Sequence, residues 1–408
     1  MHTILIHQAF VTKDEPGGTR HYELGRRLVA DGQRFTVVAS DVSYHTGKRV
    51  VPRTKFVTEC NEDGVRILRA FTYAAVHKSY VARVFSFLSF MTTSVLVGIG
   101  AGKPDVVMGT TPPIFQAVSA WALSAVRRKP FLLEVRDLWP EFAIDIGLLK
   151  NLTLIRIARA LERFLYKHAD HLLVNSPAYR DYLIEKGIDP SKVSFIPNGV
   201  DPDMFDPATD GSRIRRQFGL EGKFVATYAG ALGMANDLDV LVGAAEALQS
   251  RGDIHILIVG DGKERARLEE SARSKGLRNI TFAGSFPKSQ MNEVLAASDA
   301  CVAILRNIPM FTTTYPNKVF DYMAAGRPIV LAIDGVIREV VEAADGGVFV
   351  KPGNPELLAA AIARLADQPE RASAMGRSAR EYVVQHFNRD LHARELALLI
   401  AKVAANTR

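Results

Sequence analysis

The stretch Ile196-Pro197-Asn198-Gly199-Val200-Asp201-Pro202 divides the chain into two halves of similar pattern. Proline, asparagine and glycine in this order are typical of a turn or linker. On each side of it, short apolar runs alternate with segments of helical length, which predicts parallel strands joined by right-handed helical crossovers. The 408 residues also exceed what one hydrophobic core usually supports. We therefore expect two α/β domains in tandem, with no short repeat along the chain.

The expected elements follow this alternation in both halves. Buried strands are predicted at 4–6, 35–39, 65–68, 105–108, 131–135, 171–174 and 193–196, and then at 224–228, 255–259, 280–282, 300–304, 328–331 and 347–350. Helices are predicted at 19–30, 114–126, 152–168 and 179–185, and then at 238–249, 264–275, 290–296, 317–325 and 355–366. The tail is helical in pattern from about 370 to 405, with a break near 386–388. We expect an N-terminal domain at 1–200, a C-terminal domain at 201–385 and a last helix at 386–408 that packs on the first domain.

The composition is that of an ordinary globular protein, with 48% hydrophobic and 23% charged residues. Cys60 and Cys301 are the two cysteines of the chain. They argue against a disulfide framework or a cysteine metal site and fit a reducing compartment. The formal charge of +7 favours anionic partners such as nucleotide phosphates or an acidic membrane surface. The sequence has no basic and aromatic module for nucleic acid, which is therefore not expected as a partner.

One apolar segment, residues 84–102, interrupts the pattern because it contains no charged residue. Its length approaches the roughly 20 residues that span a bilayer. Three interpretations stay open: a buried helix, an apolar helix that faces a membrane, and a transmembrane helix. The last is least favoured, because it would place strands of one sheet on opposite sides of the membrane. Residues suited to the headgroup region precede the segment, namely Tyr73, His77, Lys78, Tyr80 and Arg83.

Two adjacent glycines follow the first predicted strand, in Glu15-Pro16-Gly17-Gly18-Thr19-Arg20. They let the backbone approach a ligand, and the helix that starts here offers free N–H groups to an anion. The G-x-G-x-x-G pattern is absent, so NAD and FAD are not favoured. Phosphate binding at Gly17 and Gly18 and an ordinary turn remain equal alternatives. His21 is either a catalytic base or a residue of the first helical turn.

Charged residues gather where the strand at 131–135 ends, in Glu134-Val135-Arg136-Asp137-Leu138-Trp139-Pro140-Glu141. Open α/β sheets bind their ligands at the carboxyl ends of the strands. We expect Asp137 to be an active-site carboxylate. The structural alternative is an ion pair between Asp137 and Arg136.

Glycines also end two predicted strands of the second half, in Tyr-Ala-Gly-Ala-Leu-Gly at 228–233 and Val-Gly-Asp-Gly at 259–262. Glycines at two strand ends of one sheet open a crevice for a nucleotide. The candidate residues here are Gly230, Gly233, Gly260 and Asp261.

The densest group of motif residues is Tyr315-Pro316-Asn317-Lys318-Val319-Phe320-Asp321-Tyr322-Met323-Ala324-Ala325-Gly326-Arg327-Pro328. It predicts a loop, a short helix with Asn317 as its cap, and the next strand. Lys318 would lie near the positive end of the helix and bind a diphosphate. Asp321 would share its face and accept the two hydroxyls of a ribose. An ion pair between Lys318 and Asp321 is the alternative.

These motifs, in this order, resemble family 4 glycosyltransferases of the GT-B fold over nearly the whole chain. The segments 17–24 and 136–141 are similar to the L-N-acetylfucosaminyl transferase subgroup, which builds O-antigen and capsule repeat units. The resemblance implies two Rossmann-like domains that face a central cleft, with the C-terminal helix crossing back. It implies retaining hexosyl transfer of an N-acetylated aminosugar from a UDP-sugar to a polyprenyl-diphosphate-linked saccharide. It also implies transfer without a metal or a cofactor. The apolar segment and the basic charge of the chain predict a cytoplasmic protein that is peripheral to the inner face of the plasma membrane.

The resemblance also assigns roles to the candidate residues. The catalytic candidates are Asp137, His21 and Lys318, of which Lys318 would neutralise the leaving nucleotide. The donor would contact Gly17, Gly18, Gly230, Gly233, Gly260, Asp261, Lys318 and Asp321. The acceptor side would be formed by Arg20, Arg136, Trp139 and Glu141.

The chain departs from the family pattern at four places. Thr313 stands where an acid is common, Asp321 where a glutamate is common, and Arg136 where a histidine is common. Residues 233–236 lack the usual basic pair, so phosphate neutralisation falls on Lys318, with Arg306 as a helper. Two alternatives to transfer stay open: a UDP-sugar epimerase of the same fold, and a non-catalytic scaffold that binds a nucleotide sugar.

Overall fold

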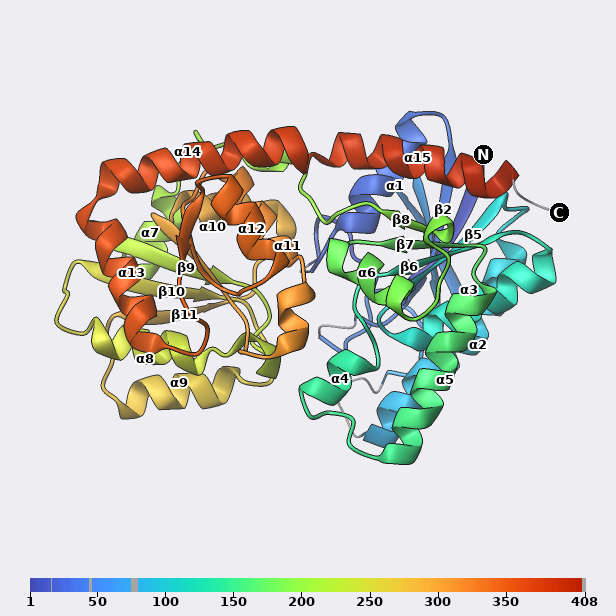
Figure 1. Ribbon diagram of the computed structural model, residues 1–408, viewed down its shortest axis with the longest axis horizontal. Coiled ribbons are helices and arrows are strands. Elements are labelled where there is room, and N and C mark those ends of the chain that lie inside the picture. Colours follow the sequence, from blue (N-terminus) through green and yellow to red (C-terminus); the bar gives the residue numbers. More distant parts are fainter. Residues whose placement is uncertain (16, 44–45, 75–79, 406–408) are drawn as a thin grey trace. The chain divides into compact units, whose positions relative to one another are not determined.

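The computed structural model describes residues 1–15, 17–43, 46–74 and 80–405 (Figure 1). The chain divides into two compact units. The first unit comprises Met1–Thr12, Thr19–Pro197 and Asp390–Arg408, and the second comprises Lys13–Gly18 and Asn198–Arg389. The division after Pro197 falls inside the linker quoted above, and the return to the first unit falls at Asp390 rather than at 386.

The first unit is built on an eight-stranded sheet of order β3-β4-β2-β1-β5-β6-β7-β8. Its strands are β1 (His2–Ile6), β2 (Arg34–Ser40), β3 (Val57–Glu62), β4 (Val65–Ala70), β5 (Val106–Thr111), β6 (Phe131–Val135), β7 (His171–Val174) and β8 (Val193–Phe195). All neighbours pair in parallel except β3, which is antiparallel to β4. The strand order reverses between β1 and β5, and such a switch point opens a crevice at the carboxyl ends of the strands.

Helices complete the first unit: α1 (Arg20–Ala30), α2 (Tyr80–Gly100), α3 (Ile114–Arg127), α4 (Glu141–Asp145), α5 (Leu152–His168), α6 (Pro177–Glu185) and α15 (Arg389–Ala405). The last helix, α15, buries Leu396 and Ile400 in one apolar core with Leu5 of β1 and Leu28 of α1. The C-terminal helix therefore packs on the N-terminal domain, as the resemblance implies (Figure 1).

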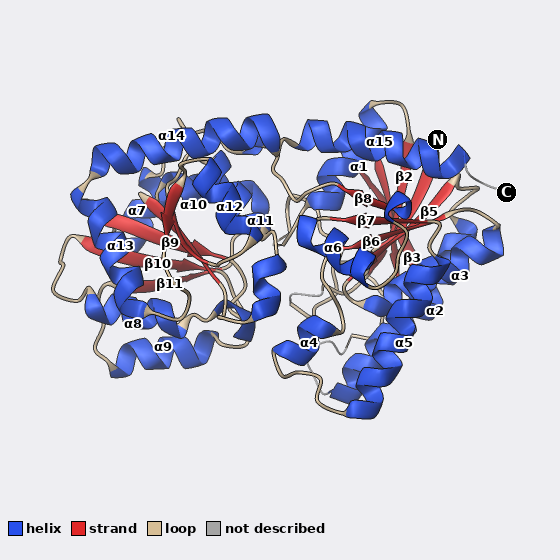
Figure 2. Cartoon of the chain, in the orientation of Figure 1, coloured by secondary structure: helices blue, strands red, loops and turns tan. Residues whose placement is uncertain are grey.

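The second unit is built on a parallel sheet of order β11-β10-β9-β12-β13-β14 (Figure 2). Its strands are β9 (Phe224–Ala229), β10 (Ile254–Val259), β11 (Ile280–Gly284), β12 (Ala300–Ile304), β13 (Ile329–Ala332) and β14 (Gly347–Phe349). Its helices are α7 (Ser212–Phe218), α8 (Asp239–Ala247), α9 (Arg265–Ser274), α10 (Met291–Ala296), α11 (Asn317–Ala324), α12 (Val336–Ala343), α13 (Pro355–Asp367) and α14 (Pro369–His386).

Each face of the second sheet has its own core, because successive side chains of a strand point to opposite faces. Leu257 and Leu331 belong to one cluster, whereas their neighbours Ile256 and Val330 belong to the other. Helices cover both faces of such a sheet, which explains why its strands are continuous apolar runs. The two-domain α/β fold expected from the sequence is thus confirmed.

The apolar segment forms most of α2, of which Ala82–Gly100 is long and apolar enough to cross a membrane by length and composition. One face of α2 packs on α3 and on strands β2 and β4. Gly98 permits the close approach to α3, since a Cβ there would lie 2.6 Å from Leu123 Cδ2. The other face exposes large apolar side chains, and only 28% of the segment is buried. The helix is therefore buried on one face only.

Candidate active site

Lys318, the second residue of α11, extends into the loop that follows β9. Its Nζ donates to Tyr228 Oη at 2.9 Å and to Asn236 Oδ1 at 3.1 Å. It also lies 4.2 Å from the centre of the Tyr228 ring. Burial lowers the pKa of Lys318 to about 7, because desolvation disfavours the charged ammonium. Since its partners among the described residues are neutral, an anion bound here would stabilise the charged form.

Gly230 and Gly260 shape the loops around Lys318 by their missing side chains. A Cβ on Gly230 would lie 2.8 Å from Lys318 Nζ, so this glycine makes room for the lysine. A Cβ on Gly260 would lie 1.8 Å from Gly230 O, and its φ of +143° is one that favours glycine. Gly233 has open space around it, with Asn236 Nδ2 at 3.9 Å. The Asp261 side chain is exposed and lies 3.8 Å from Arg265.

Two tyrosines that the sequence interpretation did not single out fix this loop. Tyr322 Oη donates to Ala229 O at 3.0 Å and accepts from Ala229 N at 2.8 Å. Tyr228 Oη donates to Ala231 O at 2.8 Å while it accepts from Lys318. The signal available in the sequence was the spacing of Lys318 and Tyr322, four residues apart and so on one helix face.

Two predictions about the residues next to Lys318 differ from the structure. Asp321 pairs with Lys288 at 2.6 Å, so the alternative of a Lys318–Asp321 ion pair is wrong. Asn317 does not cap α11, because Pro316 occupies the cap position with a φ of −67°. Asn317 is instead the first helical residue, and its buried Oδ1 accepts no hydrogen bond from the described residues.

The glycines at 17 and 18 belong to the second unit, although they follow the first strand. Gly17 has a φ of +143°, again a conformation that favours glycine. A Cβ on Gly18 would lie 3.5 Å from Asn317 Nδ2. The glycine pair therefore lies at the start of α11. Pro16, which the same motif includes, lies outside the described residues.

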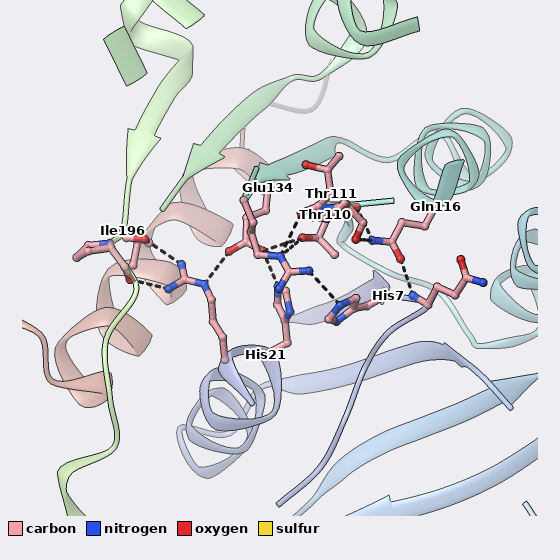
Figure 3. Close-up of polar contacts among 12 residues, drawn as sticks. His7, His21, Thr110, Thr111, Gln116, Glu134 and Ile196 are labelled. Carbon is pink, nitrogen blue, oxygen red and sulfur yellow. Dashed lines mark hydrogen bonds and ion pairs between the residues drawn. The ribbon is translucent and has the colours of Figure 1, made fainter. Parts of the chain in front are cut away.

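In the first unit, polar side chains gather around Glu134 at the end of β6 (Figure 3). Its fully buried carboxylate accepts from Arg20 Nε at 2.9 Å, His21 Nε2 at 2.5 Å and Thr110 Oγ1 at 3.0 Å. Desolvation is the largest influence on the Glu134 pKa and raises it. The positive charges around it outweigh this effect and hold the pKa well below its usual value. Glu134 is therefore ionised at neutral pH.

Arg20, expected on the acceptor side, joins this cluster to the linker. Its Nη1 donates to Pro197 O at 2.5 Å and its Nη2 to Ile196 O at 2.9 Å. Together with the bond to Glu134, these contacts fix α1, β6 and the end of the first unit relative to one another. The structure thus gives Arg20 a positioning role within the fold.

Arg136 is directed to the same cluster and not to the neighbouring Asp137. Its Nε donates to Thr110 Oγ1 at 2.9 Å and lies 3.7 Å from Glu134, and its Nη2 lies 3.2 Å from His7 Nε2. Desolvation raises the pKa of Asp137 to about 6, with Arg136 opposing the shift. A half-buried carboxyl with a pKa near neutrality suits a proton-transfer role. His7, Thr110 and Glu134 were missed as site residues, although each lies at or beside the end of a strand.

The remaining acceptor-side candidates are Trp139, just before α4, and Glu141, the first residue of α4. Glu141 accepts two hydrogen bonds of 2.8 Å from Arg159, which attach α4 to α5. Trp139 is half-buried, and its backbone N donates to Asp137 O at 2.9 Å. Within the described ranges, no group of three His, Cys, Asp or Glu side chains is arranged to hold a metal ion.

Comparison with known proteins agrees with this fold. Residues 17–199 match the family described as glycosyl transferase 4-like domain, and residues 223–368 match glycosyl transferases group 1. WcaI of Escherichia coli K12, a candidate colanic acid biosynthesis glycosyl transferase, is 24% identical and aligns over 90% of this chain and 92% of its own. The glycosyltransferase candidate WbjE of Pseudomonas aeruginosa is 23% identical over 80% of this chain and 81% of its own. The crystal structure of Anabaena HepE with UDP and glucose superposes with a TM-score of 0.73 at 18% identity, covering 98% of this chain and 99% of that one.

The chain is therefore a glycosyltransferase of the GT-B fold. Its N-terminal half is a glycosyl transferase 4-like domain and its C-terminal half is a group 1 domain. The names of the two curated relatives favour transfer over the epimerase and scaffold alternatives.

Proposed function

We propose that the protein transfers a sugar from a UDP-sugar to a lipid-diphosphate-linked saccharide during surface polysaccharide synthesis, with retention of anomeric configuration and without a metal. An N-acetylated aminosugar is the proposed cargo. WcaI, named for colanic acid biosynthesis, supports the polysaccharide pathway. The HepE complex with UDP and glucose supports the class of donor.

The observation that best supports a diphosphate donor is the environment of Lys318. Among the described residues, this buried ammonium contacts the phenol and ring of Tyr228 and the amide oxygen of Asn236, all neutral groups that compensate its charge incompletely. A nucleotide diphosphate at the start of α11 would supply the missing negative charge, and the helix dipole would add to the attraction. During transfer, the same charge would stabilise the leaving UDP. Transfer without a metal ion needs such a cationic side chain to stabilise the leaving diphosphate.

The donor's other contacts are proposed from the same region. Gly17 and Gly18 would let the diphosphate approach the backbone beside Asn317. The ribose would bind at Asp321, whose carboxylate is oriented by its pairing with Lys288. Gly230 and Gly260 would act indirectly, since their lack of a side chain shapes the loop that holds Lys318. Gly233 and Asp261 are exposed enough to contact the nucleotide directly.

The acceptor is proposed to bind the first unit, where Asp137, Arg136 and His21 lie close to the carboxyl ends of β1, β5 and β6. A pKa of about 6 lets Asp137 exchange a proton near neutral pH. Trp139 on the same loop and Glu141 at the start of α4 would border the acceptor.

A membrane-facing surface would present the lipid-linked acceptor. The exposed side of α2 carries Phe85, Leu88, Leu96 and Ile99, spaced as one helical face. Helix α5 exposes Leu152, Leu154 and Ile157 beside basic residues, and α3 packs against both helices. Apolar side chains next to basic ones suit an anionic bilayer surface. We propose peripheral attachment at the inner face of the plasma membrane. Of the upstream residues, His77 and Lys78 lie outside the described residues, as does the side chain of Tyr80.

The decisive experiment measures UDP release from a panel of UDP-sugars, with and without a polyprenyl-diphosphate-linked sugar. Acceptor-dependent release that persists in EDTA would establish transfer, name the donor and support metal independence. The anomeric configuration of the product, read by NMR, tests retention. Release that requires an added divalent cation, or release of a different nucleotide from a GDP-sugar panel, would contradict the proposal.

A further inference from the structure

Two buried histidines lie side by side in the first unit, next to the ionised Glu134 (Figure 3). His7 follows the end of β1, and His21 lies in the first turn of α1. Their ring centres are 4.6 Å apart at an interplanar angle of 72°, and each residue is 2% exposed. The roles given above to His21 do not require His7, so the pair calls for its own explanation.

The hydrogen position on His21 follows from Glu134. An ionised carboxylate can only accept hydrogen bonds, and its Oε2 lies 2.5 Å from His21 Nε2. His21 Nε2 must therefore carry the hydrogen. Desolvation lowers the pKa of His21 even though Glu134 raises it, so the ring is neutral at pH 7. Its Nδ1 is then a bare acceptor, and this buried atom has no hydrogen-bond partner among the described residues.

The hydrogen position on His7 follows from Arg136, and it is on the other ring nitrogen than in His21. A guanidinium can only donate, and Arg136 Nη2 lies 3.2 Å from His7 Nε2, so this nitrogen must accept. Desolvation, together with the charge of Arg136, holds the pKa of His7 well below its usual value. The neutral ring therefore carries its hydrogen on Nδ1. This donor is also buried without a partner in the part of the chain that the structure describes.

The pair thus offers one unused donor and one unused acceptor on adjacent rings. Buried polar atoms without partners are rare in native proteins and call for a ligand or an ordered water. The unpartnered Oε1 of Gln8 and Oγ1 of Thr111 are two more such atoms, at the ends of β1 and β5. Strands β1 and β5 are neighbours where the strand order reverses, which is the place for a ligand in an open α/β sheet.

We propose that His7 and His21 together hold one hydroxyl group of the acceptor saccharide, which donates to His21 Nδ1 and accepts from His7 Nδ1–H. Rings 4.6 Å apart are close enough for one oxygen to reach both, because each hydrogen bond spans roughly 2.7–3.2 Å. A phosphate or carboxylate is disfavoured, since it cannot donate to His21 and would approach the charge of Glu134. The inference rests on the proposed function, because it takes the acceptor to be a saccharide.

Two substitutions of His7 separate this binding role from a structural one. Asparagine places an amide N–H where Nδ1 was, and glutamine places an amide oxygen where Nε2 was. His7→Asn therefore keeps the donor to the hydroxyl and loses the contact with Arg136, whereas His7→Gln does the reverse. We expect His7→Gln to raise the acceptor KM by about tenfold or more, the usual effect of one lost hydrogen bond to an uncharged ligand group. His7→Asn should stay within about threefold, with the donor KM unchanged in both.

The matched control is His171→Gln, on the same sheet at the opposite, amino end of β7. Glutamine there can keep the contact of His171 Nε2 with Ser194 Oγ, now 2.8 Å, so acceptor kinetics should not change. A larger loss in His7→Asn than in His7→Gln, or an equal loss in both, would overturn the proposal. An acceptor analogue without the bound hydroxyl loses the bonds to both rings, so it should raise the KM of the wild type more than His7→Gln does, and with this analogue the wild type and His7→Gln should have the same KM.

A measurement on the unmodified protein keeps the test independent of activity and of the folding of the variants. Two-bond 1H–15N spectra of protein labelled with 15N-histidine distinguish the two tautomers of each ring. We expect His7 protonated on Nδ1 and His21 on Nε2, and the opposite tautomer in either ring would overturn the inference. Absence of transfer to any saccharide would instead refute the proposed function, while the tautomers would still be decided by the spectra.

Discussion

At the scale of single residues, the proposed donor chemistry depends most on Lys318. Its Nζ is held by neutral groups, so its charge is available to a ligand. Lys318→Ala should lower kcat by roughly 10²-fold or more, the size of effect seen when a buried group that stabilises developing charge is removed. Lys275→Ala, which removes an exposed lysine of the same unit paired with Glu246, is the control and should leave kcat unchanged. Near-normal turnover of Lys318→Ala at full substrate saturation would sink the assignment.

The pKa of Lys318 gives a second prediction at the same scale. With a pKa of about 7, much of the free lysine is neutral at pH 8, whereas a bound diphosphate favours the ammonium. UDP binding should therefore take up a proton, and the affinity should fall by up to about tenfold per pH unit above 7. Calorimetry at pH 8 in two buffers of different ionisation enthalpy measures this uptake. Lys318→Arg should remove the uptake, because arginine stays charged. A wild type without proton uptake would contradict the prediction.

Gly260 allows a test of the backbone contact with Gly230 that shapes the loop after β9. In Gly260→Ala, the new Cβ would lie 1.8 Å from Gly230 O at a φ of +143°, so backbone must move. We expect the free energy of unfolding of the second unit to fall by about 3 kcal/mol or more. Gly233→Ala is the matched control, since among the described residues only Asn236 Nδ2 lies within 4 Å of the new Cβ and φ is −118°. It should change the stability by about 0.5 kcal/mol or less. Urea titrations that gave equal losses would show that the clash is relieved without cost.

At the scale of elements, the sequence is most informative where a segment has one environment along its length. The strands at 171–174 and 300–304 and the helix at 152–168 have the bounds predicted for them. Strand β3 was missed because it is a mostly exposed edge strand, Val57–Glu62, without an apolar run. The short helices α7 and α12, of seven and eight residues, were also missed. Few turns make helical periodicity hard to distinguish from a loop, although α11, which is equally short, was predicted from its motif.

The site was predictable in its charged residues but not in their partners. Lys318 could be found because it lies at the start of a helix inside a motif. A Cβ on Gly230 would lie too close to Lys318 Nζ, which explains why a glycine follows β9. The cluster around Glu134 joins side chains from α1, β5 and β6 with the loop after β1, which are far apart in sequence. Whether Arg136 pairs with Glu134 or with Asp137 depends on that packing, which a sequence pattern does not reveal.

Helix α2 carries the prediction that belongs to the element scale. Its exposed face includes Phe85 at 60% and Leu96 at 52% exposure, neither of which packs in the first unit's core. The triple variant Phe85→Ser, Leu88→Ser and Leu96→Ser should lose most of its flotation with anionic liposomes. Each buried apolar side chain contributes about 1.5–3 kcal/mol, so losing three weakens binding severely. The melting temperature should not fall, because the packed face of α2 is unchanged.

The control for α2 is Leu398→Ser on α15, an equally apolar substitution at a residue that is 73% exposed. It should float like the wild type. If the triple variant also floated like the wild type, or if the wild type stayed at the bottom of the gradient, α2 would not be the membrane contact. Salt should weaken the flotation, since part of the attraction would be electrostatic.

At the scale of the whole molecule, the order of the chain makes the first domain depend on the last residues. Helix α15 is separated in sequence from the rest of the first unit by the whole second unit. Its side chains nonetheless complete the core that includes β1 and α1. The second unit has cores on both faces of its sheet that contain no residue of α15. Helix α15 therefore stabilises the domain that is synthesised first, which cannot complete its core until α15 has been made.

This dependence predicts that the two domains respond separately to a change in α15. Ile400 is fully buried in the first unit's core, so Ile400→Ala should destabilise that domain by about 2–5 kcal/mol. Leu398→Ala on the same helix removes an exposed side chain and should cost little. Differential scanning calorimetry should show the first domain's transition at a lower temperature in Ile400→Ala, while the second domain's transition stays in place. Added UDP should raise only the second transition, because ligand binding stabilises the domain that binds it. If one cooperative transition moved as a whole with both the substitution and UDP, the domains would unfold together, and α15 would be coupling them.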